Sequence, residues 1–172
     1  MENQASSKNI ILNYGLYYGV ISVILSLIMY ATGNHLEQNM IGMLLGFVIM
    51  IAFIVLATKK FKDDNQGFLS WGQGVKTGMG VVLIGIIISG IYTYLFANFI
   101  EPDFKNQIIE KSIVQWQDAG MTSDQIEMST KMTEDYFYLS LYGGMIIGGL
   151  VLGFIFSAIT AAIMKKSEEE TY

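Results

Sequence analysis

Residues Tyr136–Met164 read YFYLSLYGGMIIGGLVLGFIFSAITAAIM, a stretch of 29 residues without a single charged side chain or histidine. A helix needs about 20 apolar residues to cross the hydrocarbon core of a bilayer. Three further uncharged stretches of this kind are present: Ile10–Ala31, Met40–Thr58 and Thr77–Ile100. Helices of a soluble bundle would each carry a polar face, whereas these are apolar all round. The sequence therefore predicts an all-α membrane protein with four transmembrane helices.

Composition supports this class and excludes several others. Of the 172 residues, 52% are hydrophobic and 15% are charged, against about 25% charged residues in a soluble domain. The chain has no cysteine, which excludes disulfides, thiolate metal ligands and cysteine nucleophiles. A net charge of −5 argues against nucleic acid as a partner, since nucleic-acid binders are normally basic. The composition therefore indicates the lipid bilayer as a partner.

The distribution of lysine predicts the orientation, because cytoplasmic ends of membrane helices collect basic residues. Four crossings place seven of the ten basic residues on one side: Lys8, Lys59, Lys60, Lys62, Lys76, Lys165 and Lys166. The other three, Lys105, Lys111 and Lys131, lie in one long loop on the opposite side. We therefore expect a multi-pass membrane protein with both termini in the cytoplasm.

These signals predict a single integral membrane domain over residues 1–172. Its spans cover residues 10–31, 40–58, 74–100 and 136–164, and an acidic tail at 167–172 is expected to be disordered. Ser70 and Gln73 have the spacing of a capping box, so the third helix should begin before its apolar run does.

Residues 101–135, between the third and fourth spans, are predicted to form an outer two-helix hairpin. This segment holds eight acidic residues and three lysines, and its net charge of −5 equals that of the whole chain. Pro102 fits the first position of a helix, and Ile109, Ile113 and Trp116 then follow on one helical face. Gly120 is a plausible end for that helix.

A second helix should restart at Thr122 and Gln125, which again have the spacing of a capping box. Met128, Met132 and Tyr136 then form one apolar stripe that leads into the fourth span. We expect this stripe to pack on the other helix of the hairpin or on the outer ends of the spans. A soft-metal site built from the methionines is the alternative, but neither His nor Cys lies beside them in the sequence.

Each span region carries a Gly-x-x-x-Gly motif. The predicted helix-packing residues are Gly15, Gly19, Gly42, Gly46, Gly74, Gly78, Gly144, Gly148, Gly149 and Gly153. In lipid, helices gain little by hiding apolar side chains, so close approach of their backbones at small residues supplies the contact. The motifs indicate either packing within the chain alone or, in addition, a remaining face that makes a homo-oligomer or docks another membrane protein.

The sequence shows no arrangement of side chains typical of catalysis, cofactor binding or metal binding, so no catalytic residue, cofactor or metal site is predicted. The interiors of the spans contain no Asp, Glu, Lys, Arg or His, whereas coupled carriers normally keep such a residue there. His35 is the only histidine and has Glu37 two residues away, but a metal site needs three or four ligands. We expect a non-enzymatic membrane protein that acts through helix–helix or envelope-side interactions.

An uncoupled channel or carrier is the alternative function. It requires a polar cavity between the spans, lined by Asn13, Ser22, Ser26, Thr77, Ser89 and Thr93.

Four short motifs carry a family resemblance. They are Gly15-Leu16-Tyr17-Tyr18-Gly19, Gly67-Phe68-Leu69-Ser70-Trp71, Ile91-Tyr92-Thr93-Tyr94 and Ile100-Glu101-Pro102-Asp103. Over about residues 8–165 the chain resembles an uncharacterised family of small four-span bacterial membrane proteins, a domain of unknown function frequent in Bacteroidetes. The resemblance implies a plasma-membrane protein with four helices and an outer helical insertion, and it brings no catalytic residues.

Overall fold

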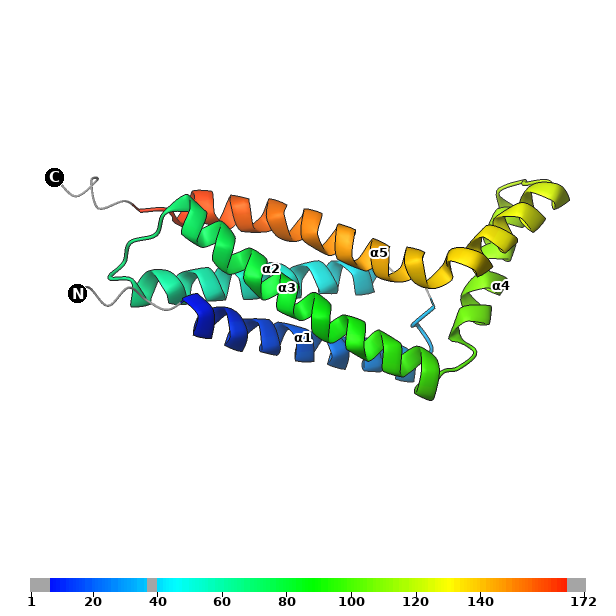
Figure 1. Cartoon of the computed structure of the whole chain (residues 1–172), viewed down its shortest axis with the longest axis horizontal. Helices are drawn as coiled ribbons and strands as arrows, with labels where there is room; N and C mark the ends of the chain where they lie inside the picture. The colour runs from blue at the N-terminus through cyan, green and yellow to red at the C-terminus, as the bar shows by residue number, and fades with distance from the viewer. Residues whose placement is uncertain (1–6, 37–39, 167–172) are drawn as a thin grey trace. The chain divides into compact units, whose positions relative to one another are not determined.

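The computed structural model describes residues 7–36 and 40–166, and within them the chain is helical. The helices are α1 (Ser7–Ala31), α2 (Met40–Asp64), α3 (Trp71–Leu95), α4 (Phe104–Asp118) and α5 (Ser123–Met164), as Figure 1 shows. A π-helical turn, η1 (Phe96–Ile100), directly extends α3. The predicted all-α class is confirmed, and α1, α2, α3 with η1, and α5 are long and apolar enough to cross a membrane. The predicted disordered tail 167–172 lies outside the described residues.

Both predicted capping boxes are present. The Ser70 backbone N–H donates to the Gln73 side-chain oxygen at 2.8 Å, and the Gln73 N–H donates to Ser70 Oγ at 3.2 Å. The corresponding distances for Thr122 and Gln125 are 2.9 and 3.4 Å. These bonds satisfy N–H groups that have no partner within the first turn of a helix. Gly120, at a φ of +78°, supplies the left-handed residue that follows α4.

Pro102 does not begin a helix, so that prediction is wrong. The N–H of Phe104 donates to the carbonyl of Glu101 at 3.0 Å, which closes a β-turn with Pro102 at its second position. Asp103, at φ −84° and ψ 1°, has the third-position geometry of a type I turn, the type that favours proline just before it. Helix α4 therefore begins two residues later, and the Asp103 carboxylate accepts a hydrogen bond from the Asn106 side chain at 2.8 Å.

The chain, predicted from sequence as one domain, divides into two compact units by its internal contacts. The first unit comprises Met1–Ser89 with Ile147–Tyr172, and the second comprises Gly90–Ile146. Helices α3 and α5 each contribute residues to both units.

The core of the first unit is small compared with the apolar surface that surrounds it. Its buried side chains form two clusters: Ile10, Ala57, Phe61, Leu69 and Val81 in one, and Met50, Ile54 and Val82 in the other. In contrast, Ile163 is 78% exposed and Met40 is 69% exposed. Water-soluble monomers rarely expose apolar surface on this scale, whereas lipid would cover it at no cost.

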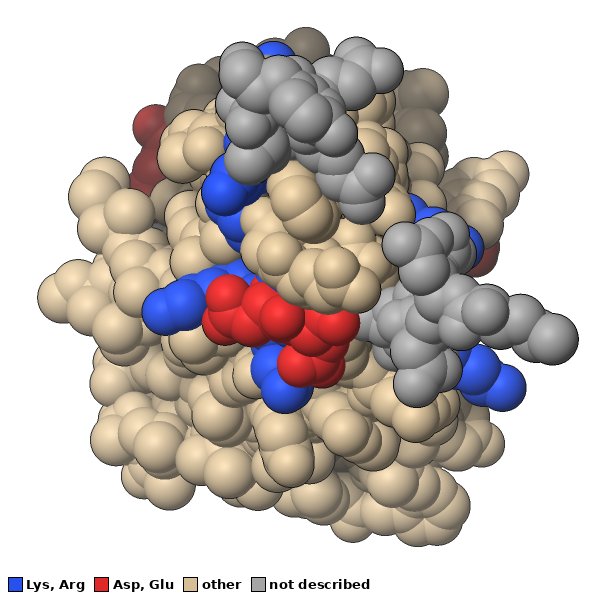
Figure 2. Space-filling view, turned by 90° about the vertical axis from the view of Figure 1, so that its left-hand side faces the viewer, with Lys and Arg blue, Asp and Glu red and all other residues tan. Residues whose placement is uncertain are grey.

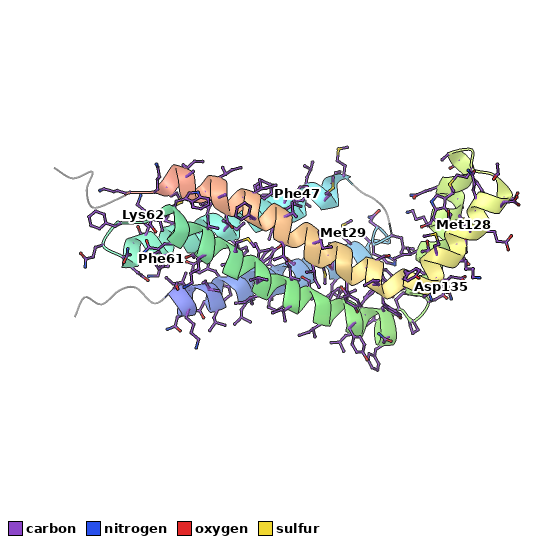
Figure 3. The ribbon with its side chains drawn as sticks, turned by 45° about the horizontal axis from the view of Figure 1, so that its top comes forward. Met29, Phe47, Phe61, Lys62, Met128 and Asp135 are labelled. Atoms are coloured by element: carbon purple, nitrogen blue, oxygen red, sulfur yellow. The ribbon has the colours of Figure 1, made fainter. Side chains whose placement is uncertain are left out.

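The lysine-rich end of the first unit is held together by contacts between distant parts of the chain. Leu69 and Lys166 exchange two backbone hydrogen bonds of 3.0 and 2.9 Å. Lys62 Nζ, labelled in Figure 3, donates to the carbonyl of Met164 at 2.9 Å. Figure 2 looks onto this end and shows basic and acidic side chains close together. Lys60 Nζ forms an ion pair with Asp64 at 2.7 Å. The loop before α3 is thereby tied to the end of α5.

Candidate functional site

Two glycines of α1 bring its backbone against α3. A Cβ placed on Gly15 would lie 2.6 Å from Ile84 Cβ, and one placed on Gly19 would lie 2.5 Å from Ile88 Cδ1. Real side chains essentially never approach a neighbour this closely, so only glycine fits at either position without a shift of the neighbouring side chain. The Gly15/Gly19 motif therefore forms a packing site within the chain, on two residues that are both buried.

The crossing of α1 and α3 is reciprocal, because glycines of α3 receive side chains of α1 in turn. A Cβ on Gly80 would lie 2.7 Å from Ile11 Cγ2, and one on Gly85 would overlap the ring of Tyr18. Gly80 is not part of a Gly-x-x-x-Gly motif, since Lys76 and Ile84 occupy the positions four residues away, so the sequence pattern did not predict its role. Ridges of large side chains from each helix thus enter gaps left by glycine in the other, which allows close backbone contact in lipid.

Two glycines at the beginning of α3 perform the same role against the end of α5. A Cβ on Gly74 would lie 2.6 Å from Ala161 Cβ, and one on Gly78 would overlap the hydroxyl oxygen of Ser157. Both glycines are buried, as are Ala161 and Ser157.

Further along α5, Gly149 and Gly153 accept side chains of α3. Their Cβ atoms would lie 2.7 Å from Ile86 Cδ1 and 2.9 Å from Val82 Cγ1, respectively. Helix α3 therefore contacts both α1 and α5 at glycine-lined crossings, and it is the central helix of the first unit.

The other four predicted packing glycines lie elsewhere. A Cβ on Gly42 would lie 3.1 Å from the terminal methyl of Met29, a contact that a flexible side chain can relieve. A Cβ on Gly46, Gly144 or Gly148 would meet no described atom within 4 Å. These three glycines are therefore not used for packing within the described part of the chain.

The interior of the first unit also contains buried hydroxyl groups. Thr58, Thr77 and Ser157 are fully buried. Thr77 Oγ1 donates to the Gln73 carbonyl at 2.8 Å, whereas Thr58 Oγ1 and Ser157 Oγ have no hydrogen-bond partner in the described structure. Ser157 Oγ instead faces the Cα of Gly78, where a Cα–H can serve as a weak donor.

The polar residues that would line a channel, as considered from the sequence, do not gather on one surface. Asn13 and Ser26 are exposed on α1, whereas Thr77 is fully buried. Ser22 Oγ donates to the Tyr18 carbonyl of its own helix at 2.8 Å, the usual way in which a hydroxyl is satisfied in a helix. This arrangement gives no support to a polar cavity between the spans.

The second unit has an aromatic core that joins α3, η1, α4 and α5. Successive ring centroids in this chain of contacts are 5.3–6.4 Å apart, within the range of favourable aromatic pairs. The rings are Tyr92, Phe96, Phe104, Phe137, Tyr138 and Tyr142. Lys105 adds a cation–π contact 5.9 Å from the centroid of Phe137 and donates to the Glu134 carbonyl at 3.0 Å.

The helical backbone is irregular at two places in or next to this aromatic core. In η1 the N–H of Glu101 donates to the carbonyl of Phe96 at 2.8 Å, a bond over five residues. Tyr136, at φ −112° and ψ 15°, interrupts α5 with a kink. π-Helical turns such as η1 are rare and recur at functional sites.

The methionine stripe does not pack within the chain as predicted. Met128, Met132 and Tyr136 are 68%, 54% and 55% exposed. The prediction is wrong because another face of α5, with the partly buried Thr133 and the buried Phe137, is turned inward. An unpartnered apolar stripe therefore remains on the surface of the second unit.

His35 and the acidic residues were considered as metal ligands. Within residues 7–36 and 40–166, no three His, Cys, Asp or Glu side chains come close enough to hold a metal ion. The His35 ring lies edge-on to the ring of Tyr30 with 4.9 Å between the centroids. Glu37, its predicted neighbour, lies outside the described residues.

Comparison with known proteins places these features in a family. Searches of the curated proteins and of the solved structures gave no match to the chain. A family model described as "Protein of unknown function (DUF4199)" matches residues 13–166. This match covers most of the chain, including three candidate spans in full and the first from residue 13 onward, and it bears out the resemblance to an uncharacterised family with four apolar helices. The chain belongs to the DUF4199 family.

Proposed function

We propose that this chain is a non-enzymatic, multi-pass protein of a bacterial plasma membrane that works by helix–helix association, with a second copy of itself as the partner. The unused glycines of α5 carry the proposal. Gly144 and Gly148 lie one turn apart with no described atom within 4 Å of an added Cβ, whereas Gly149 and Gly153 of the same helix contact α3.

The side chains around these glycines fit such an interface. Ile147 and Val151, which lie beside them on the helix, are 66% and 52% exposed. A small-x-x-x-small motif flanked by branched apolar residues allows two backbones to approach closely in lipid. The same glycines would otherwise only weaken the helix, since glycine is about 1 kcal/mol less favourable there than alanine.

Energy transfer between labelled copies tests the association. The chain has no cysteine, so one introduced cysteine at Lys59 can carry either a donor or an acceptor dye. We expect transfer between copies in vesicles at high lipid-to-protein ratio, and its loss when Gly144→Leu and Gly148→Leu are combined. Gly46→Leu, at another open glycine of a different helix, is the matched control and should leave transfer unchanged.

Two results would overturn the proposal. One is the absence of transfer in the wild type at protein densities found in the native membrane. The other is loss of transfer with Gly46→Leu while the α5 double variant retains it.

The same cysteine-free background tests the orientation, in which both termini and Lys59–Lys62 lie in the cytoplasm. A cysteine at Lys59 should react with a membrane-impermeant maleimide only after the cells are opened, and a cysteine at Asp118 should react in intact cells. The reverse pattern would show that the lysine distribution does not set the orientation of this chain.

A further inference from the structure

The exposed methionine stripe belongs to a surface that continues into the membrane. On α5, Met128, Met132 and Tyr136 precede Leu139 and Ile146 at helical spacing, and the last two are 70% and 45% exposed. Leu139 and Ile146 lie within the uncharged stretch that spans the bilayer, so lipid is what covers them. All five residues belong to the second unit.

The part of α5 before its kink presents three distinct faces. The inward face carries Ile126, Thr133 and Phe137, which are partly or fully buried. The charged face is exposed and holds Asp124, Glu127, Lys131 and Glu134. Met128 and Met132 lie apart from both, on a third face that continues past Tyr136; Met128 and the exposed Asp135 are labelled in Figure 3.

We infer that the segment Ser123–Tyr136 of α5 is a membrane-surface helix, whose Met128/Met132/Tyr136 stripe inserts between the lipid headgroups. An amphipathic helix lies in the interface when its apolar face enters the headgroup–acyl boundary and its charged face stays in water. Tyrosine is enriched at this level of the membrane, and Tyr136 stands where the stripe meets the span. Continuity with the lipid-covered face identifies the bilayer as the occupant.

The inference gives the kink at Tyr136 a structural role. If α5 had no kink, its first 13 residues would project out of the membrane along the axis of the span. The non-helical backbone of Tyr136 allows this segment to adopt a different direction from the span. The inference concerns lipid alone, so it does not depend on the association of copies proposed above.

The charge of the acidic segment, residues 101–135, determines which lipid headgroups favour insertion. Its net charge of −5 repels anionic headgroups, because like charges near a surface raise the free energy of approach. The segment should therefore insert into zwitterionic phosphatidylcholine and insert less deeply into a bilayer rich in phosphatidylglycerol.

Spin-label accessibility in nanodiscs tests the inference. Nitroxides are attached to single cysteines at Met128 and Met132, and at Glu127 and Lys131 as matched controls on the charged face of the same turns. In phosphatidylcholine nanodiscs that hold one copy each, the labels at 128 and 132 should collide severalfold more often with oxygen, relative to a water-soluble nickel chelate, than those at 127 and 131. Added phosphatidylglycerol should reduce this contrast.

Two outcomes would overturn the inference. Equal accessibility of all four labels to the nickel chelate would place the stripe in water. Low collision rates with both reagents at 128 and 132 would place it against protein instead of lipid. Thermal unfolding of each labelled variant, followed by circular dichroism, ensures that the comparison is made on folded protein.

Discussion

Gly78 of α3 and Ser157 of α5 face each other so closely that a Cβ on Gly78 would overlap the Ser157 hydroxyl. Both residues are buried, and Ile54 of α2 lies beside them, 3.0 Å from the same Cβ position. Three helices thus meet at one residue that has no side chain. In lipid, where apolar burial contributes little, this contact depends on shape.

Gly78→Ala should therefore destabilise the protein, by about 1–3 kcal/mol as for an overpacked core. Unfolding in detergent, followed by circular dichroism, measures the change. Gly46→Ala, at an open position of α2, is the control and should be neutral or slightly stabilising. Ser157→Gly in the Gly78→Ala background should recover part of the loss; no recovery would mean that the strain lies elsewhere.

Lys62→Met should destabilise the lysine-rich end, because the α5 carbonyl of Met164 loses the donor that satisfies it. A hydrogen bond from a charged donor contributes about 1.5–3 kcal/mol. Lys60→Met removes only an exposed ion pair with Asp64 and should cost less than about 1 kcal/mol. Chemical denaturation of both variants compares them, and an equal loss would contradict the distinct role of Lys62.

Phe137 and Tyr136 are neighbours in contrasting environments, so alanine substitutions at the two positions can be compared directly. Phe137 is 5% exposed within the aromatic core, whereas Tyr136 is 55% exposed. Phe137→Ala should cost about 3–5 kcal/mol and speed hydrogen exchange throughout α4 and the start of α5. Tyr136→Ala should leave exchange in α4 unchanged, so similar exchange in both variants would argue against an aromatic core.

Thr122→Ala should loosen the beginning of α5, since the hydroxyl that accepts the Gln125 backbone N–H is lost. The expected cost is about 1 kcal/mol, as for other N-caps, and it should appear as faster exchange of the amides at 123–126. Thr122→Ser keeps the hydroxyl and should retain most of the protection. Equal exchange in the two variants would show that the cap does not stabilise this end.

Local chemistry made parts of this fold predictable. The four spans follow from hydropathy, and the capping boxes at Ser70 and Thr122 follow from side chains three residues apart that bond to each other's backbone. Pro102 was misplaced because its fixed φ suits a type I turn as well as a first helical turn.

The choice between glycines was not predictable, since it depends on the rotation of each helix about its axis. Gly148 and Gly149 are adjacent in sequence, yet only Gly149 contacts a neighbouring helix. The methionine stripe shows the same limit. Helical spacing groups Met128 with Met132, but it does not say whether that face or the Phe137 face turns inward.

The π-helical turn Phe96–Ile100 has a genetic consequence. Its bond from Glu101 to Phe96 spans one residue more than a regular helical turn, so the turn is equivalent to a single inserted amino acid. Loss of one codon there would remove the extra residue and let the regular ladder resume, while the chain that follows keeps its direction. Natural variation in chain length within the family should therefore occur at this turn, because a one-residue deletion there would leave the start of α4 against Phe137, whereas a deletion in the regular part of α3 would rotate the chain that follows by about 100°.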